Sequence, residues 1–268
     1  MPEATRAGTA FTLTKWYVDC VAPDGRAVIG YWTSLAWRGL ALTWQNVVLY
    51  EPGRPPARRS SLASAPPPAV SGDAISWSAP ALGCVIDVAL RQPPFAERLL
   101  EDDTGIVEWQ VQAPAGVVSV DMRGFAPVRG PGYAERIRIT VPPWRLPIRE
   151  LRWGRWHDAA PDRSVVWIDW RGESPRTWVF VDGIRTSSAV VTDDGVSAGP
   201  MNLVLGERRT LEDHALSDIV ATIPPLQALV PKSLLALRQT KWCGSGTLSD
   251  GSDASLSGHA IHEVVVFA

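Results

Sequence analysis

Hydrophobic and polar residues alternate with a period of two along most of the chain. At the start of the pattern, Trp16 and Val18 share one side of the chain, whereas Tyr17 and Asp19 share the other. Such alternation is typical of β-strands. It predicts strands at Phe11–Cys20, Val28–Leu35, Leu40–Tyr50, Cys84–Arg91, Val107–Gln112, Val117–Met122, Ala134–Val141, Val165–Trp170, Thr177–Val181, Ile184–Val191, Asn202–Leu205 and Ala260–Phe267. The fold class is therefore predicted to be all-β.

Turn residues separate these strands. Pro23-Asp24-Gly25 predicts a turn, and Asp182-Gly183 between two apolar strands predicts a two-residue hairpin. Helical patterns are short and are confined to Pro94–Asp102 and Thr210–Ile219. The Ser-, Gly- and Asp-rich run 244–258 is interpreted as a flexible hairpin loop, with a lid over a barrel mouth as the alternative.

Two proline-rich segments indicate how the chain is organised. Residues 52–69 hold six prolines and predict an exposed loop. The segment Pro142–Pro147 cannot pair within a central strand and predicts a connection between two β domains, 10–141 and 148–268. A single large β-sandwich is the alternative.

The composition excludes several classes of function. Net charge is −2 with both signs interspersed, so no basic patch for nucleic acid is predicted. No apolar run approaches 18 residues and residues 1–10 lack an apolar segment, which predicts neither a membrane span nor secretion. Cys20, Cys84 and Cys243 lack metal or disulfide spacing and predict free buried thiols in the cytoplasm. The chain is expected to be a monomer or a small homo-oligomer, and phosphate-loop or dinucleotide motifs that would predict a cofactor are absent.

Tryptophan is unusually frequent, with 13 residues against 4 tyrosines and 5 phenylalanines. Six of the tryptophans fall between Trp144 and Trp178, interleaved with arginines. One interpretation is a ladder of stacked Trp and Arg side chains on sheet faces. The other is an aromatic pocket for a lipophilic or cation-forming ligand.

Four segments carry a resemblance to a known family. These are Lys15–Arg26 (KWYVDCVAPDGR), Gly130–Glu135 (GPGYAE), Leu151–Trp156 (LRWGRW) and Val166–Gly172 (VWIDWRG). In order and spacing they resemble the carotenoid 1,2-hydratase (hydroxyneurosporene synthase) family over about residues 11–183. Lys15 stands where that family has an acidic residue, and its D-x-N motif is Glu135-Arg136-Ile137 here, without the Asn.

The resemblance implies a superfamily of two tandem lipocalin-like β-barrel domains, which includes AttH-type proteins and β-barrel Diels–Alderases. Its members bind extended, mostly hydrocarbon substrates within or between the barrels. The function implied is proton-initiated hydration or cyclisation of an isoprenoid or polyene, with a lipophilic small molecule as the partner. A non-catalytic carrier of a lipophilic molecule, or a pericyclase that acts by shape alone, is the alternative.

Glu135 is the main catalytic candidate. It shares a strand face with Ile137 and Ile139, and desolvation on an apolar face favours the neutral acid that a proton donor needs. Tyr133, on the same face, is the candidate that positions the acid or a water molecule. The alternative is a structural ion pair between Glu135 and an inward arginine such as Arg155.

The remaining candidates are aromatic or charged residues on predicted strands. Trp16 and Trp153 are expected to stabilise a carbocation through their indole faces. Asp19 is either catalytic or solvent-facing, and Asp169 lies either in a pocket or in a surface ladder. Glu263 shares parity with Ile261 and Val265 and is a second inward carboxylate, while the remaining substrate-binding candidates are Tyr31, Arg155 and Trp167.

A metal site formed by His259, His262 and Glu263 is not expected. Strand residues three apart point to opposite faces, and no cluster of ligands accompanies these histidines.

Overall fold

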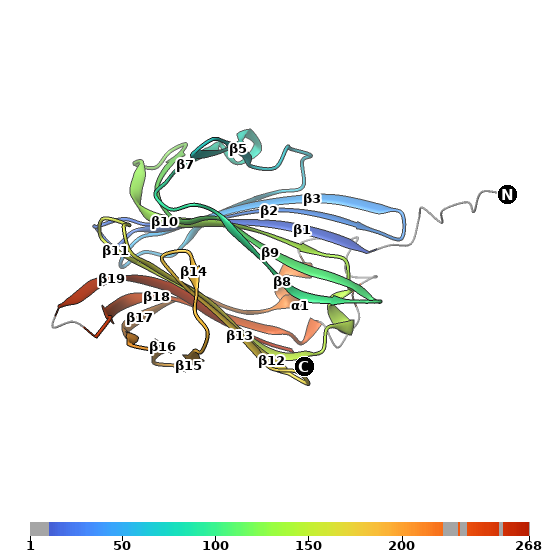
Figure 1. Ribbon diagram of the computed structural model, residues 1–268. Helices are drawn as coiled ribbons and strands as arrows, with labels where there is room; N and C mark the ends of the chain where they lie inside the picture. The colour runs from blue at the N-terminus through green and yellow to red at the C-terminus, as the bar shows by residue number, and fades with distance from the viewer. Residues whose placement is uncertain (1–10, 222–229, 231–234, 252–253, 268) are drawn as a thin grey trace. The chain divides into compact units, whose positions relative to one another are not determined.

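The structure is a computed structural model that describes residues 11–221, 230, 235–251 and 254–267. It confirms the all-β class and divides the chain into two compact units, Met1–Pro142 and Pro143–Ala268. The division falls within the proline-rich segment. Figure 1 shows the strands of each unit as a strongly curled sheet.

The first unit holds an antiparallel sheet and one short 3-10 helix, η1 (Pro80–Leu82). The order across the sheet is β4-β3-β2-β1-β10-β9-β7-β6-β5, and β8 pairs with β9. Its strands are β1 (Thr12–Val21), β2 (Ala27–Trp37), β3 (Leu40–Tyr50), β4 (Ala57–Ser61), β5 (Ala69–Ser71), β6 (Ala74–Ala79), β7 (Cys84–Leu90), β8 (Phe95–Asp102), β9 (Gly105–Met122) and β10 (Val128–Ile139).

The second unit repeats this plan. Its strand order is β14-β13-β12-β11-β19-β18-β17-β16-β15. The elements are η2 (Pro143–Arg145), β11 (Ile148–Asp158), β12 (Ser164–Gly172), β13 (Arg176–Val181), β14 (Ile184–Arg185), β15 (Val190–Val191), β16 (Gly195–Ala198), β17 (Met201–Ala215), α1 (Leu216–Val220), β18 (Arg238–Ser249) and β19 (Ser255–Val266). In both units the first strand pairs with the last in the middle of the sheet, and the sheet is curled into a half-barrel, as predicted for tandem lipocalin-like domains.

Each curled sheet has one face that packs around its own hydrophobic core, called here the core face. In the first unit this face carries Trp16, Val18 and Trp32. In the second unit it carries Trp156 and Trp167. Because strand neighbours alternate, every other residue lies on the opposite face. Of the six tryptophans between Trp144 and Trp178, Trp144 lies in η2, and the other five are divided between the two faces of one sheet.

Several local predictions are confirmed. Asp182 and Gly183 have φ values of 51° and 77° and join β13 to β14, as expected for the hairpin turn that needs two positive φ angles. Cys20, Cys84 and Cys243 are free and buried, and burial raises the pKa of the Cys84 thiol to about 12.

Other local predictions are wrong. The segment Pro94–Asp102, expected to be a helix, contains strand β8, because it pairs with β9. The helix expected at Thr210–Ile219 is reduced to α1, since β17 pairs with β18 as far as Ala215. The loop expected over 244–258 is mostly the paired strands β18 and β19, with residues 252–253 outside the described part. The exposed proline-rich loop 52–69 contains β4.

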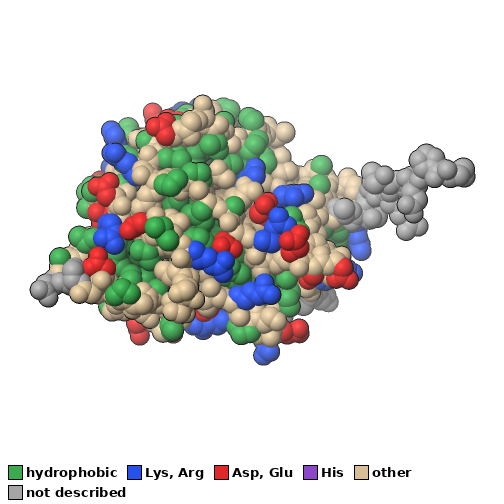
Figure 2. Space-filling view, viewed as in Figure 1, with side chains coloured by type: hydrophobic (Ala, Val, Ile, Leu, Met, Phe, Trp, Pro, Cys, Tyr) green, Lys and Arg blue, Asp and Glu red, His purple; other side chains and the backbone are tan. Residues whose placement is uncertain are grey.

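Charged side chains of both signs are interspersed over the face shown in Figure 2. Within the described ranges, no helix is long and apolar enough to cross a membrane.

Candidate active site

Two irregularities in β9 shape the surroundings of Glu135. Between Gly132 and Glu135 of β10, the partner strand β9 advances from Gly116 to Val111, so that β9 contributes two extra residues. Pro114 lies inside this stretch. Proline has no backbone N–H to donate, so at a regularly paired position it would interrupt the ladder of hydrogen bonds. Such bulges re-aim side chains and are frequent beside active sites.

The carboxyl group of Glu135 is held by two donors. The indole N–H of Trp109 and the hydroxyl of Tyr133 both donate to Oε2 of Glu135, each at 2.6 Å. Trp109 and Tyr133 are both fully buried. Because the two hydrogen bonds come from different strands, they fix the orientation of the carboxyl group.

A second carboxylate lies on the same face of the sheet. Asp19 is 1% exposed and Oδ2 accepts a 2.9 Å hydrogen bond from the hydroxyl of Tyr17. The register places Asp19 beside Tyr133, and Tyr17 beside Glu135. Asp19 is therefore buried, and the solvent-facing interpretation is wrong.

Aromatic rings connect these groups. The Tyr17 ring lies 5.5 Å from Tyr31 and 6.2 Å from Tyr133, centroid to centroid, and Tyr31 stacks on Trp44. The ammonium group of Lys15 lies 4.8 Å from the centre of the Tyr31 ring. We call Tyr17, Asp19, Tyr31, Trp109, Tyr133 and Glu135 the tyrosine–carboxylate cluster. The register also puts Tyr50 on this face, so that all 4 tyrosines of the chain lie there.

The structure thus brings together four of the candidates chosen from the sequence, Asp19, Tyr31, Tyr133 and Glu135. It does not place Trp16 with them. Trp16 belongs to the core face, where it pairs in register with Arg136 rather than with Glu135. The expected role of Trp16 in stabilising a cation beside Glu135 is therefore wrong.

Candidates in the second unit are divided between the two faces of its sheet. Trp167 and Asp169 are on the core face. Trp153, Arg155 and Glu263 are on the opposite face, as the register between β11 and β19 shows. The side chain of Arg155 is fully buried and donates to the backbone oxygen of His259.

Asp169 is engaged in a charged network. Its two carboxylate oxygens accept hydrogen bonds from Arg171 and Thr177, both at 2.7 Å. Arg171 also binds Glu150, which in turn binds Arg152. These contacts are those of a structural ladder rather than of an open pocket.

Glu263 has a buried cation beside it that the sequence did not reveal. The ammonium group of Lys241, only 1% exposed, lies 2.9 Å from Oε2 of Glu263 and 5.6 Å from the centre of the Trp153 ring. Gln239 donates to the same oxygen at 2.7 Å. Lys241 was missed because its strand, β18, begins in a segment without clear alternation.

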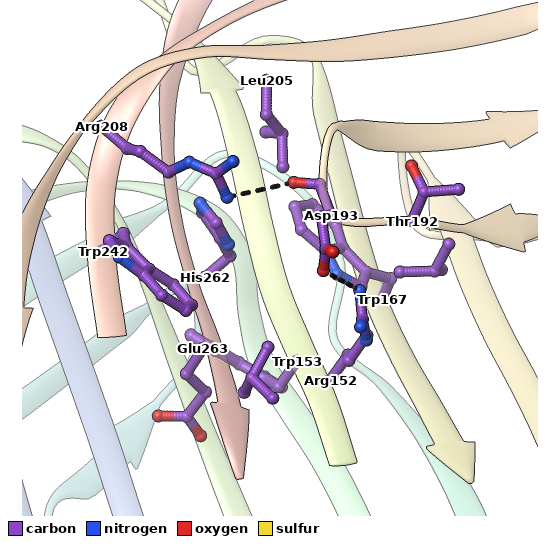
Figure 3. Close-up of a pocket in the computed structure, with 12 residues that line it drawn as sticks. Arg152, Trp153, Trp167, Thr192, Asp193, Leu205, Arg208, Trp242, His262 and Glu263 are labelled. Atoms are coloured by element: carbon purple, nitrogen blue, oxygen red, sulfur yellow. Dashed lines mark hydrogen bonds and ion pairs between the residues drawn. The ribbon is translucent and has the colours of Figure 1, made fainter. Parts of the chain in front are cut away.

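A pocket opens at the core face of the second unit (Figure 3). Its lining includes Trp167, Arg208, Trp242 and His262, and Figure 3 shows the imidazole of His262 between Arg208 and the indole of Trp242. His259 lies three positions away on β19 and faces the other side of the sheet. Among the residues that the structure describes, no group of three His, Cys, Asp or Glu is placed to hold a metal ion.

Two members of the tyrosine–carboxylate cluster, Tyr17 and Trp109, were not selected from the sequence. The alternation along its own strand shows which face of the sheet each of these residues shares with its neighbours. It does not show which strands pair. Only the register, Tyr17 opposite Glu135 and Trp109 opposite Ile137, reveals the contact.

Comparison with known proteins identifies the fold. No family model and no curated protein matches the sequence. The AttH-like protein NE1406 of Nitrosomonas europaea matches with a TM-score of 0.57 and 11% identity, over 100% of this chain and 97% of that chain. CghA, in a structure with Sch210972, matches with a TM-score of 0.53 and 11% identity, over 96% and 89%. Kievitone hydratase from Nectria haematococca matches with a TM-score of 0.50 and 8% identity, over 100% and 93%. At these identities the likeness is one of fold, and it confirms the fold expected from the resemblance.

Proposed function

We propose that the chain is an enzyme that protonates a carbon–carbon double bond of a lipophilic substrate, with Glu135 as the acid. The observation that carries the proposal is the pair of hydrogen bonds from the buried side chains of Trp109 and Tyr133 to Oε2 of the half-buried Glu135. A carboxyl group fixed by two rigid aromatic donors has the defined orientation that general acid catalysis requires.

The reaction begins with the transfer of one proton from Glu135 to the alkene. Because Oε2 already accepts two hydrogen bonds, the transferred proton is assigned to Oε1 of Glu135. Its transfer to the alkene leaves a carboxylate and a carbocation. The hydrogen bonds from Trp109 and Tyr133 stabilise the carboxylate as it forms. In hydration, water captures the cation and returns a proton to the Glu135 carboxylate. In cyclisation, an internal double bond captures the cation, and the cyclised cation then loses a proton from a neighbouring carbon to the Glu135 carboxylate.

Aromatic rings on the same face supply the surroundings that a carbocation needs. We assign to the ring of Tyr17 the role suggested above for Trp16, since the ring of Tyr31 already stacks on Trp44 and has the Lys15 ammonium group over it. A ring face over a cation contributes about 0.5–2 kcal/mol, more when water is excluded. Tyr17 also donates to Asp19, and this hydrogen bond fixes the orientation of the Tyr17 side chain.

The names of two fold neighbours agree with a small-molecule role. One neighbour is a hydratase, and another was obtained with Sch210972. An isoprenoid or polyene remains the proposed substrate class for this chain. A carrier of a lipophilic molecule is the second candidate, since the same aromatic face would serve for binding alone.

Glu135→Gln tests the mechanism, because it keeps the shape of the side chain and removes its acid. Purified protein would be incubated with a panel of isoprenoid and polyene alkenes, and products would be detected by mass spectrometry as hydrated or isomeric species. We expect loss of turnover by at least about 100-fold, as for removal of a general acid, with substrate affinity within a few fold. Glu108→Gln is the matched control, since Glu108 lies on the neighbouring strand β9, on the face opposite Trp109, paired with Arg98.

Each alternative has its own outcome. Undiminished turnover in Glu135→Gln would contradict the acid mechanism and favour a reaction steered by shape. Saturable binding without turnover of any alkene in the panel would favour the carrier.

A further inference from the structure

Every residue that lines the pocket belongs to the second unit, whereas the tyrosine–carboxylate cluster belongs to the first. Its inner volume is about 20 Å³, room for about one water molecule. With the open mouth included, the empty volume rises to about 300 Å³. The pocket can therefore take one small polar group at its base, with the rest of a ligand in the mouth.

A β-bulge brings Arg208 to this pocket. Leu205 pairs with Gly246, and Arg208 pairs with Gly244, so that three steps along β17 match two along β18. Without the extra residue, Arg208 would lie on the opposite face from Leu205. With it, Arg208 shares the core face with Trp242 and His262.

Two arginines line the pocket, Arg152 and Arg208, and Arg208 has the weaker ion pairs. The other, Arg152, donates to Glu150 at 2.6 Å and pairs closely with Asp193. Arg208 instead lies 3.5 Å from Asp194, whose side chain is 87% exposed, and donates to the backbone oxygen of Asp193. An exposed pair of this length contributes little, so a ligand could replace Asp194 at small cost.

The acidic residues of the lining are already compensated. Asp193 faces Arg152, as Figure 3 shows, and Glu263 turns its carboxylate away from the pocket, where Lys241 binds it. The pocket therefore has one positive charge to offer, that of Arg208, which suits a monoanion better than a dianion.

His262 provides a second polar group at the base. Its side chain is only 7% exposed and stacks on Trp242 at 5.1 Å, and within the described part of the chain it has no hydrogen-bond partner. Its ring nitrogens are not enclosed by the protein, so they are open to a ligand in the pocket. Burial, reinforced by Arg208, lowers the pKa of His262 to about 4, and the ring is neutral at pH 7, with one N–H to donate.

We propose that this pocket binds the carboxylate group of a small organic acid, with one oxygen at His262 and the other at Arg208. The flanking indoles of Trp167 and Trp242 and the side chain of Leu205 would hold the planar or apolar remainder in the mouth. Glu135 does not line this pocket.

Benzoate, benzamide and inorganic phosphate are suitable probes of the full-length protein. Benzamide has the shape of benzoate without the charge, and phosphate has a higher charge without the ring. The readouts are the NMR signals of the His262 imidazole and tryptophan fluorescence at constant ionic strength. We expect benzoate to shift the His262 signals saturably, and benzamide and phosphate to bind at least about tenfold more weakly, because a charge-assisted hydrogen bond is lost or an excess charge is left.

Amino-acid substitutions test whether benzoate binds at this pocket rather than elsewhere on the protein. Arg208→Gln should weaken benzoate binding at least about tenfold. Arg238→Gln is the matched control, because Arg238 is 67% exposed, pairs with Asp213 and lies away from the pocket, and it should leave binding unchanged. Glu135→Gln should also bind benzoate normally, which distinguishes failure of this proposal from failure of the proposed function.

Three results would overturn the proposal. They are His262 signals that benzoate does not move in the wild-type protein, benzamide or phosphate binding as tightly as benzoate, and Arg208→Gln binding benzoate like wild type.

Discussion

His262 shows how a single buried side chain couples the stability of this protein to pH. Its pKa is lowered from an ordinary value of 6.5 to about 4, first by burial and then by Arg208. Asp193 raises this pKa, Arg152 lowers it and Glu263 raises it, each by less than burial and Arg208 lower it. The unfolded chain therefore takes up a proton at His262 at a higher pH than the folded chain does.

The sign of the effect follows from that difference. Between pH 6.5 and about 4 the unfolded state binds more protons, so the free energy of unfolding falls as the pH is lowered through this range. For His262 the loss is about 3 kcal/mol, at 1.36 kcal/mol per pKa unit. Urea unfolding at several pH values should show a shallower pH dependence in His262→Gln than in wild type. Burial also lowers the pKa of His259, and because that residue is present in both proteins its effect cancels in the comparison. Equal slopes in the two proteins would contradict the prediction.

At the scale of the element, the alternation of residues was sufficient to predict most long strands and which residues share a face. It could not predict which strands pair or where bulges fall. Glu135 and Tyr133 were selected correctly as neighbours on one face, but Trp109 reaches Glu135 only through the register of β9 with β10. Arg208 lies in the pocket only because a bulge reverses its parity. Segments with weak alternation, such as β8 and β18, become strands through their partners rather than through their own composition.

At Gly154 in β11, the packing of Trp167 depends on the absence of a side chain. A Cβ atom at this position would lie 2.2 Å from the Trp167 ring and 2.8 Å from the Cβ atom of His262. Gly154→Ala should therefore displace Trp167 and destabilise the protein by about 1–3 kcal/mol, as overpacking of a core does. Denaturant unfolding of Gly154→Ala, Trp167→Phe and the double variant measures this. Because phenylalanine is the smaller side chain, the double variant should cost less than the sum of the single ones. Simple additivity would show that the Trp167 ring is not what resists the extra methyl group.

At the scale of the whole molecule, the chain builds the same strand order twice. In each unit, three strands run outward from the first strand to one edge, and the later strands return from the far edge until the last pairs with the first. Each half-barrel has its own hydrophobic core, around Trp77 in one unit and around Trp156 in the other. Within the described ranges, every strand pair joins two strands of the same unit. Each unit therefore holds its sheet together with its own backbone hydrogen bonds.

This arrangement predicts that the covalent connection between the units is dispensable for each sheet. A protease recognition site inserted between Pro142 and Pro143 would allow the folded protein to be cut at the boundary of the two units. After cleavage, amide hydrogen exchange in β1 and β10, and in β11 and β19, should remain as slow as in the uncut protein, because these strands pair within one unit. Uncut protein that carries the same insertion is the control, since it separates the effect of cleavage from that of the added residues. Rapid exchange throughout either sheet after cleavage would show that this sheet depends on the intact chain, and the two half-barrels would then be parts of one cooperative unit.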